Sequence, residues 1–362
     1  METEMLHAVV MAGGSGTRFW PQSRKAMPKQ LLRLAGDQTM IQQTVGRCDG
    51  WIDAANTWVV TNEIQAEETG RQLPEVPSTN ILIEPCGRNT APCIGLAAAH
   101  ILRQDPDGLM FVMPADHVIG PQDVFQQAGR VAEQLVGDDA GRFVLFGVPP
   151  TFPSTGYGYI ERGAELTADG GQAYQVASFR EKPAREIAQQ YMDAGTYYWN
   201  CGIFCWKAAA ILDALKEYEP NIYARLMTLS DAVGTDSYND VLATEFPQMD
   251  STSIDYAVLE RSKSVAVVEA PFDWDDVGSW LALPRLMGED GNGNTIDGDY
   301  CGVESKGCIV RSLDGHVVAT LGVENLIIVH TPDATLVAKR DDADSIRKLV
   351  DALRESGHEG LL

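Results

Sequence analysis

The chain has 362 residues, and its 28 Lys and Arg against 51 Asp and Glu give a formal net charge of −23 at pH 7. A surface this acidic repels phosphate backbones and anionic headgroups, which argues against nucleic-acid and membrane partners. The hydrophobic fraction of 44% is ordinary for a globular protein and argues against wholesale disorder. No apolar run approaches the roughly 18 residues of a membrane-spanning helix.

The cysteines and the first residues predict a cytoplasmic protein. The chain has seven Cys, an odd number, without a CxxC pair, which fits free thiols in a reducing compartment. Glu2 and Glu4 stand where a secretory signal peptide carries Lys or Arg. The six His show no HExxH and no spacing suited to zinc.

One segment opposes the overall charge. From Met5 to Gly36 there is no Asp or Glu, although acids are abundant elsewhere. The same segment carries five cations: Arg18, Arg24, Lys25, Lys29 and Arg33. We therefore expect a local positive site without competing carboxylates.

The first 150 residues alternate short apolar runs with helical patterns. Strands are predicted at His7–Met11, Thr57–Val60, Asn80–Ile83, Leu109–Met113 and Phe143–Phe146. Helices are predicted near 38–48, 62–72, 90–103 and 121–136. This order predicts a doubly wound α/β fold with a mainly parallel sheet, which collects ligands at the carboxyl ends of its strands.

The middle of the chain, residues 150–283, is less regular. Its predicted elements are a strand ending at Phe179, a helix over 183–193, a strand over Asn200–Trp206, a helix from Lys207 and a helix over Ser253–Ser262.

The last part of the chain changes character. Gly288–Gly298 is rich in Gly, Asn and Asp and predicts turns or a linker. Alternating apolar runs then predict a β-rich region, closed by an amphipathic helix near Asp341–Glu355. We expect two domains, 1–285 and 286–362.

A glycine-rich segment, GGSGTRFWPQSRKAMPKQ, follows the first strand. Three Gly in four positions let backbone N–H groups approach an anion, and Arg18 and Lys29 add positive charge. The segment lacks the Walker pattern, and the dinucleotide pattern fails at Phe19. We expect a phosphate site that follows neither template.

Two motifs contain candidate metal-binding aspartates, one after the predicted strand Leu109–Met113 and one in an acidic turn. Asp116 lies in MPADH and Asp276 in DWDDVGSW. Mg²⁺ bound to phosphates usually takes one or two protein carboxylates. Taken singly, Asp116 could instead cap a helix and Asp276 could belong to an exposed turn. His117 is expected to be structural.

Two further sets contain candidate ligand residues. In EPCGRNTAP, Thr90 is expected to cap the next helix, which leaves Glu84 and Arg88 unexplained. GYGYI, EKP and WNCGIF combine carboxylate, amide and aromatic groups suited to a polyhydroxyl ligand, and Lys182 suits a phosphate. Each is also compatible with ordinary turn chemistry.

Together these motifs resemble the sugar-nucleotide pyrophosphorylases, a nucleotidyltransferase family, and within it the bacterial mannose-1-phosphate guanylyltransferases. Seven strings match in family order between residues 7 and 283. The C-terminal region resembles the short left-handed β-helix-like tail of these enzymes. Longer members add a phosphomannose isomerase domain, which we do not expect in a chain ending at Leu362.

The resemblance implies an Mg²⁺-dependent transfer from GTP to α-D-mannose 1-phosphate that gives GDP-mannose and pyrophosphate. It implies a homodimer. It implies catalytic roles for Arg18, Lys29 and Asp116, and metal binding by Asp116 and Asp276. It implies nucleotide binding by Ala12, Gly13, Gly14, Ser15, Gly16, Thr17, Glu84, Arg88, Asn89 and Thr90. It implies sugar-phosphate binding by Gly156, Glu181, Lys182 and Asn200.

The base can be argued from chemistry. Guanine presents two adjacent donors, and one ionised carboxylate accepts both. We therefore expect Glu84 to recognise guanine, with the backbone of residues 87–89 as the competing candidate. Two other functions stay open: the same chemistry on another sugar 1-phosphate or nucleotide, and an inactive regulatory subunit. The retained Arg18, Lys29, Asp116 and Asp276 argue against the latter.

Overall fold

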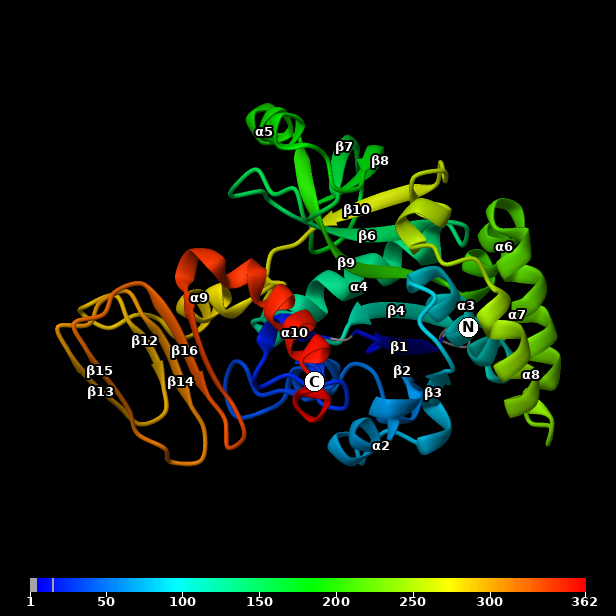
Figure 1. The fold of residues 1–362 in the computed structure, drawn as a ribbon. Coiled ribbons are helices and arrows are strands. Elements are labelled where there is room, and N and C mark those ends of the chain that lie inside the picture. Colours follow the sequence, from blue (N-terminus) through cyan, green and yellow to red (C-terminus); the bar gives the residue numbers. More distant parts are fainter. Residues whose placement is uncertain (1–4, 15) are drawn as a thin grey trace.

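The computed structural model describes residues 5–14 and 16–362, and a mixed sheet forms its centre (Figure 1). The strand order is β3-β2-β1-β4-β9-β6-β10-β8-β7. The strands are β1 (Leu6–Met11), β2 (Thr57–Asn62), β3 (Ile81–Glu84), β4 (Leu109–Pro114), β6 (Phe143–Val148), β7 (Tyr159–Leu166), β8 (Ala173–Arg180), β9 (Tyr197–Lys207) and β10 (Val265–Glu269). All run in one direction except β8 and β9, so the predicted doubly wound, mainly parallel α/β fold is confirmed.

Helices bury both faces of this sheet. In β1, Val9 packs into the cluster on one face, while Ala8 and Val10 pack into the cluster on the other. The first cluster includes α3 (Thr90–Gln104), α6 (Ala208–Tyr218), α7 (Pro220–Ala232) and α8 (Tyr238–Glu245). The second includes α1 (Met40–Gly46) and α4 (Gln122–Asp138). A strand buried on both faces explains the continuous apolar runs of the sequence.

Most predicted elements are present, with some differences in the middle of the chain. Helices α2 (Glu63–Gln72) and α5 (Arg185–Ala194) match their predictions. The helix predicted over Ser253–Ser262 is a π-helix limited to Asp255–Leu259. A small two-stranded sheet of β5 (Val118–Gly120) and β11 (Asp273–Asp275) was not predicted.

The C-terminal region is a coil of short strands followed by a helix. One sheet contains β12 (Thr295–Asp297), β14 (Ile309–Ser312), β16 (Leu326–His330) and β17 (Thr335–Lys339), and the other contains β13 (Tyr300–Val303) and β15 (Val318–Leu321). Successive strands from β12 to β16 alternate between the sheets and pair in parallel within each. This is the β-helix-like arrangement expected for the tail.

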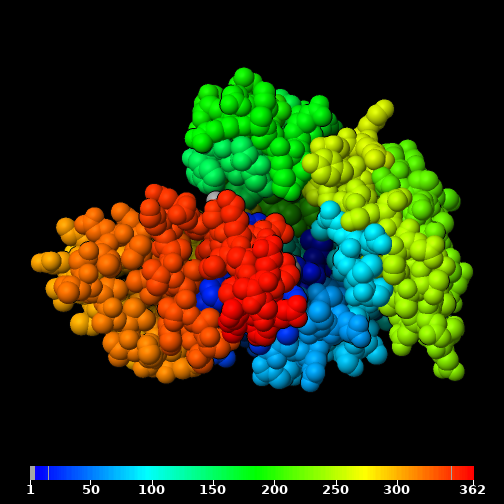
Figure 2. Space-filling model, in the orientation of Figure 1, coloured from blue at the N-terminus to red at the C-terminus, as the bar shows by residue number. Residues whose placement is uncertain are grey.

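A third buried cluster joins this region to the N-terminal loops. Phe19, Trp20 and Trp280 pack with Ile309 of β14 and with α10 (Ile346–Glu355). The helix α9 (Leu283–Met287) lies in the same cluster. In Figure 2 the red C-terminal helix covers blue N-terminal residues. Among the described residues, no helix is long and apolar enough to cross a membrane.

Candidate active site

A glycine-rich loop follows β1, and its described residues, 12–14 and 16, contact neighbouring side chains and backbone. The side-chain Nε2 of Gln30 donates to the carbonyl oxygen of Ala12 at 2.7 Å. Gly16 has a φ of 55°, and a Cβ there would lie 2.4 Å from the backbone nitrogen of Lys29. Only glycine fits, because the left-handed conformation and the close approach both exclude a side chain.

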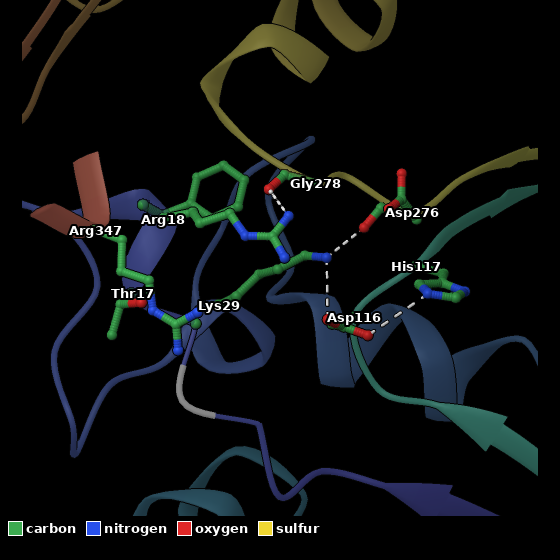
Figure 3. Close-up of a pocket in the computed structure, with 10 residues that line it drawn as sticks. Thr17, Arg18, Lys29, Asp116, His117, Asp276, Gly278 and Arg347 are labelled. Atoms are coloured by element: carbon green, nitrogen blue, oxygen red, sulfur yellow. Dashed lines mark hydrogen bonds and ion pairs between the residues drawn. The ribbon is translucent and has the colours of Figure 1, made fainter. Parts of the chain in front are cut away.

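Lys29 joins three distant segments beside this loop. Its side chain is buried, and its Nζ lies 3.0 Å from Oδ2 of Asp116 and donates to the main-chain oxygen of Asp276. Asp116 follows β4, and Asp276 follows β11 (Figure 3). The two predicted metal ligands therefore lie on either side of one buried cation. The expectation that no carboxylate competes for this cation is wrong, because chain folding brings Asp116 to it from 87 positions away.

A cavity of about 260 Å³ opens beside Lys29. Arg18 lies along it and donates from Nη1 to the main-chain oxygen of Gly278 at 3.1 Å (Figure 3). The lining residues are Gly16, Thr17, Arg18, Phe19, Lys29, Asp116, His117, Asp276, Gly278 and Arg347. Three cations and two carboxylates thus line one cavity, which suits an anion accompanied by a metal ion.

The ionisation of the cavity follows from burial and neighbouring charge. Burial alone would raise the pKa of Asp116, but the charge and hydrogen bond of Lys29, together with His117 and a backbone hydrogen bond, more than offset it, so the pKa is lowered. Burial lowers the pKa of His117 to about 4, so the imidazole is neutral at pH 7. Its Nδ1 accepts a hydrogen bond from the Trp274 indole at 3.1 Å. His117 therefore has the features of a packed structural group.

A second cavity, of about 280 Å³, adjoins the first. Both cavities include His117 and Asp276 in their lining, so these residues mark the junction. The second cavity gathers the residues predicted to bind the sugar phosphate, namely Gly156, Glu181, Lys182 and Asn200. The cleft therefore has a cation-lined part and a polar part, which share the carboxylate of Asp276.

The polar part contains a hydrogen-bonded network. Lys182 Nζ lies 2.9 Å from Oε1 of Glu181, which raises the pKa of the ammonium. Asn200 Nδ2 donates to Oδ1 of Asp255 at 2.9 Å. Burial, with the charge of Glu181, raises the pKa of Asp255 to about 6. Carboxylates, an amide and an ammonium together suit hydroxyl groups beside a phosphate.

Glu84 is the last residue of β3, and its side chain lies next to Gly13 of the glycine-rich loop. Its side chain is 5% exposed, and its Oε1 has no hydrogen-bond partner among the described residues. A Cβ added to Gly13 would lie 3.2 Å from Oε2. Burial raises the pKa of this carboxyl group to about 8. A buried acceptor without a donor is costly, and a ligand that supplies N–H groups would offset that cost.

The loop after β3 corrects the predicted cap. Asn89, and not Thr90, caps α3: its side chain accepts from the backbone N–H of Thr90, and its φ is 66°. The Thr90 hydroxyl instead accepts from the N–H of Ile254 at 2.9 Å. The Arg88 side chain donates to the main-chain oxygen of Pro247, which lies in the 3₁₀ helix Phe246–Gln248. Asn adopts a positive φ more easily than the β-branched Thr, which explains why Asn89 is the cap residue.

The structure brings together most, but not all, of the predicted site residues. The first cavity includes Gly16, Thr17, Arg18, Lys29, Asp116 and Asp276, and the second includes Thr90, Gly156, Glu181, Lys182, Asn200 and Asp276. Six predicted nucleotide ligands line neither cavity: Ala12, Gly13, Gly14, Glu84, Arg88 and Asn89. Ser15 lies outside the described residues.

Three polar side chains of the cleft were not predicted. Tyr157 donates from Oη to Oδ1 of Asp276 at 2.7 Å and so connects the two cavities. Asp255 lies in a segment whose pattern indicated only a helix. Arg347 belongs to the C-terminal helix, more than 300 positions from the glycine-rich loop. The aromatic, Gly-rich pattern around Tyr157 was a signal, whereas Asp255 and Arg347 stand in no recognisable motif.

The donor set fits a divalent metal ion that is shared with phosphates. Within residues 5–14 and 16–362, no group of three or more His, Cys, Asp or Glu is arranged to hold a metal ion. Asp276 lies at the junction of the two cavities, and Asp116 lines the first cavity. Mg²⁺ commonly takes one or two carboxylates and completes its shell with phosphate oxygens and water.

Family models match almost the whole chain. The Nucleotidyl transferase model matches residues 7–291, and the MannoseP isomerase/GMP-like beta-helix domain model matches residues 298–353. The chain belongs to the nucleotidyl transferase family. Its reaction is nucleotidyl transfer, and members of the family generally use a divalent metal ion.

Relatives within the family are similar over nearly the full chain. A mannose-1-phosphate guanylyltransferase from Escherichia coli is 43% identical over 97% of this chain and 74% of its own length, and one from Klebsiella pneumoniae gives the same values. A crystal structure from Thermus thermophilus, described as a mannose-1-phosphate geranyltransferase, superposes with a TM-score of 0.85 at 32% identity. That superposition covers 96% of this chain and 99% of the other.

Proposed function

We propose that the protein transfers a guanylyl group from GTP to α-D-mannose 1-phosphate, releasing pyrophosphate and forming GDP-mannose. The observation that carries this proposal is the pair of adjoining cavities that share Asp276, one lined by cations and one by polar groups. The names of the relatives that are 43% identical support the same substrates.

The arrangement fits an in-line displacement. The sugar phosphate already carries an anionic oxygen, so no general base is needed. This oxygen forms a bond to the α-phosphorus while the bond from that phosphorus to the bridging oxygen of the pyrophosphate breaks. The α-phosphorus would lie at the junction near Asp276, with Lys182 on the side of the nucleophile and Arg18 on the side of the leaving group. Positioning and charge neutralisation supply the catalysis.

Asp116 and Asp276 would hold Mg²⁺. When bound, the ion neutralises phosphate charge and orients the phosphate oxygens. Lys29 contacts both residues, so it fixes the distance between them and adds a positive charge at the reacting phosphates. Tyr157, by donating to Asp276, orients that carboxylate from the sugar side.

Glu84 would recognise guanine. Guanine N1–H and its 2-amino group would supply the donors that the buried carboxylate lacks. Uracil and thymine offer one N–H between two carbonyls, which suits an amide better, and adenine has no N1–H. The position of Glu84 next to Gly13 supports a base site beside the glycine-rich loop.

A homodimer and a cytoplasmic location complete the proposal. Val303 of β13 pairs with Leu321 of β15, and both side chains are exposed, at 52% and 72%. Exposed apolar side chains in the C-terminal coil support a contact between two copies there. Seven cysteines with free thiols fit a reducing compartment. Light scattering coupled to size-exclusion chromatography measures the oligomeric state.

One grid of assays tests the reaction. Pyrophosphate release is measured with Mg²⁺ for each of four nucleoside triphosphates against mannose 1-phosphate and glucose 1-phosphate. We expect the highest kcat/KM for GTP with mannose 1-phosphate. A higher value for another pair would refute the proposed substrates, and no release from any pair would refute catalysis by this chain.

A further inference from the structure

Arg347 closes one side of the cation-lined cavity but belongs to a distant part of the chain. It is the second residue of α10, the helix that follows the C-terminal strands. Its guanidinium points toward the side where Thr17 and Lys29 lie (Figure 3). Arg347 belongs to none of the sequence motifs, and the proposed reaction assigns it no role.

Arg347 also differs from other arginines of the C-terminal region. Arg340 pairs with Glu289 at 3.1 Å, and Arg354 pairs with Asp351 at 2.9 Å. Arg347 has no hydrogen bond or ion pair with any residue in the part of the chain that the structure describes. Arg347 is exposed, and its guanidinium adds a third positive charge to the lining that contains Arg18 and Lys29, where its donors are open to an anion.

The position of Arg347 is fixed by packing on either side of it. Ile346 and Val350 of α10 are buried in the cluster that contains Phe19, next to Arg18. The Trp20 indole also donates to the main-chain oxygen of Leu361 at 2.9 Å. The helix is therefore anchored directly on the segment after the glycine-rich loop, and Figure 2 shows it lying over that region.

The geometry indicates which phosphates Arg347 would meet. The sugar cavity touches the cation-lined cavity at His117 and Asp276, and Arg347 lines only the latter. An in-line displacement places nucleophile and leaving group on opposite sides of the α-phosphorus. The leaving pyrophosphate therefore extends away from the junction, toward Thr17, Arg18 and Arg347.

We propose that Arg347 binds the β- and γ-phosphates of the triphosphate, and hence the departing pyrophosphate, so that the C-terminal helix forms part of the active site. This inference rests on the proposed function for the direction of the reaction. A guanidinium is suited to the task because its planar donors match phosphate oxygens. The region that resembles a β-helix then has a catalytic use: it carries the helix that completes the phosphate site.

Product inhibition tests this assignment. We compare Arg347→Ala with wild type and with Lys348→Ala, an exposed neighbour on the same helix that does not line the cavity. In Arg347→Ala the inhibition constant for pyrophosphate should rise about 10- to 100-fold, the loss expected for a charge-assisted contact. GDP-mannose does not contain the β- and γ-phosphates of GTP, so its inhibition constant should change less than about threefold. Arg347→Lys should recover part of the loss.

Direct binding separates this inference from the proposed function. Calorimetry with magnesium pyrophosphate alone should show the same weakening in Arg347→Ala and normal binding in Lys348→Ala. Unchanged pyrophosphate affinity in Arg347→Ala, or equal losses for both products, would overturn the role of Arg347. A wild-type protein that binds pyrophosphate but does not convert GTP and mannose 1-phosphate would instead refute the proposed reaction.

Discussion

Recognition of guanine by Glu84 predicts a proton that leaves when GTP binds. In the ligand-free protein, burial raises the pKa of Glu84 to about 8. At pH 7 the carboxyl group is then roughly nine-tenths protonated, since each pKa unit is a factor of ten. Two guanine N–H donors favour the ionised form, so GTP binding lowers this pKa and releases close to one proton.

The sign and size of the pH dependence follow from this linkage. Because binding requires the ionised carboxylate, the affinity for GTP increases as the pH rises toward the pKa of the empty site and levels off above it. Between pH 6 and pH 8 the expected gain is about 50-fold, from the tenfold change per unit below the pKa. In Glu84→Gln the gain should disappear, and the ratio of kcat/KM for GTP to that for UTP should fall.

Calorimetry in buffers of different ionisation enthalpy measures the released proton. The triphosphate itself also titrates near pH 6 to 7. Binding of UTP to the wild type and of GTP to Glu84→Gln are therefore controls, because each includes this contribution without a guanine–Glu84 contact. If Glu84→Gln releases the same number of protons and keeps its preference for GTP, Glu84 does not recognise the base. The backbone of residues 87–89 would then be the recognition element.

Four further substitutions test the proposed phosphate site. Asp116→Asn or Asp276→Asn should each reduce kcat by orders of magnitude with a nearly unchanged thermal melting temperature; near-normal turnover at saturating Mg²⁺ would remove that residue from the metal site. Gly16→Ala should lower the free energy of unfolding, measured in urea, by about 1–3 kcal/mol, because its φ is 55° and its Cβ would clash with Lys29; an unchanged urea midpoint would contradict that strain. Tyr157→Phe should raise the Mg²⁺ concentration needed for half-maximal activity by about threefold to tenfold, since the Asp276 carboxylate loses a hydrogen bond from a neutral donor; an unchanged Mg²⁺ titration would show that this bond does not orient the carboxylate.

The strands and the polar residues at their ends were predictable because both depend on local sequence. Continuous apolar runs mark strands buried on both faces, and β1 and β4 lie within a residue of their predicted ends. Parallel strands bring their carboxyl ends to one edge, so the convergence of the glycine-rich loop with Asp116 also follows from topology. These inferences need no knowledge of side-chain contacts.

Contacts between distant segments were not predictable. The ion pair between Lys29 and Asp116 depends on how the loop after β1 folds over β4, and an acid-free segment gives no indication of it. The cap of α3 depended on a left-handed residue, which a choice between Asn89 and Thr90 by propensity alone does not resolve. Arg347 reaches the cavity through the packing of an entire C-terminal region, and a single arginine in an amphipathic helix carries no local signal of that.

The charge of the chain and the charge of its substrates are reconciled at the scale of one cavity. With His117 neutral, three cations and two carboxylates give the phosphate cavity a net charge of about +1, within a chain of net charge −23. A triphosphate and a sugar phosphate together carry several negative charges, so these side chains cannot neutralise both. In the proposed function, a divalent ion on Asp116 and Asp276 would supply the missing charge, without further cationic side chains that repel one another in the empty cavity. The positive charge of the site would then increase only when the substrate and the metal ion bind together.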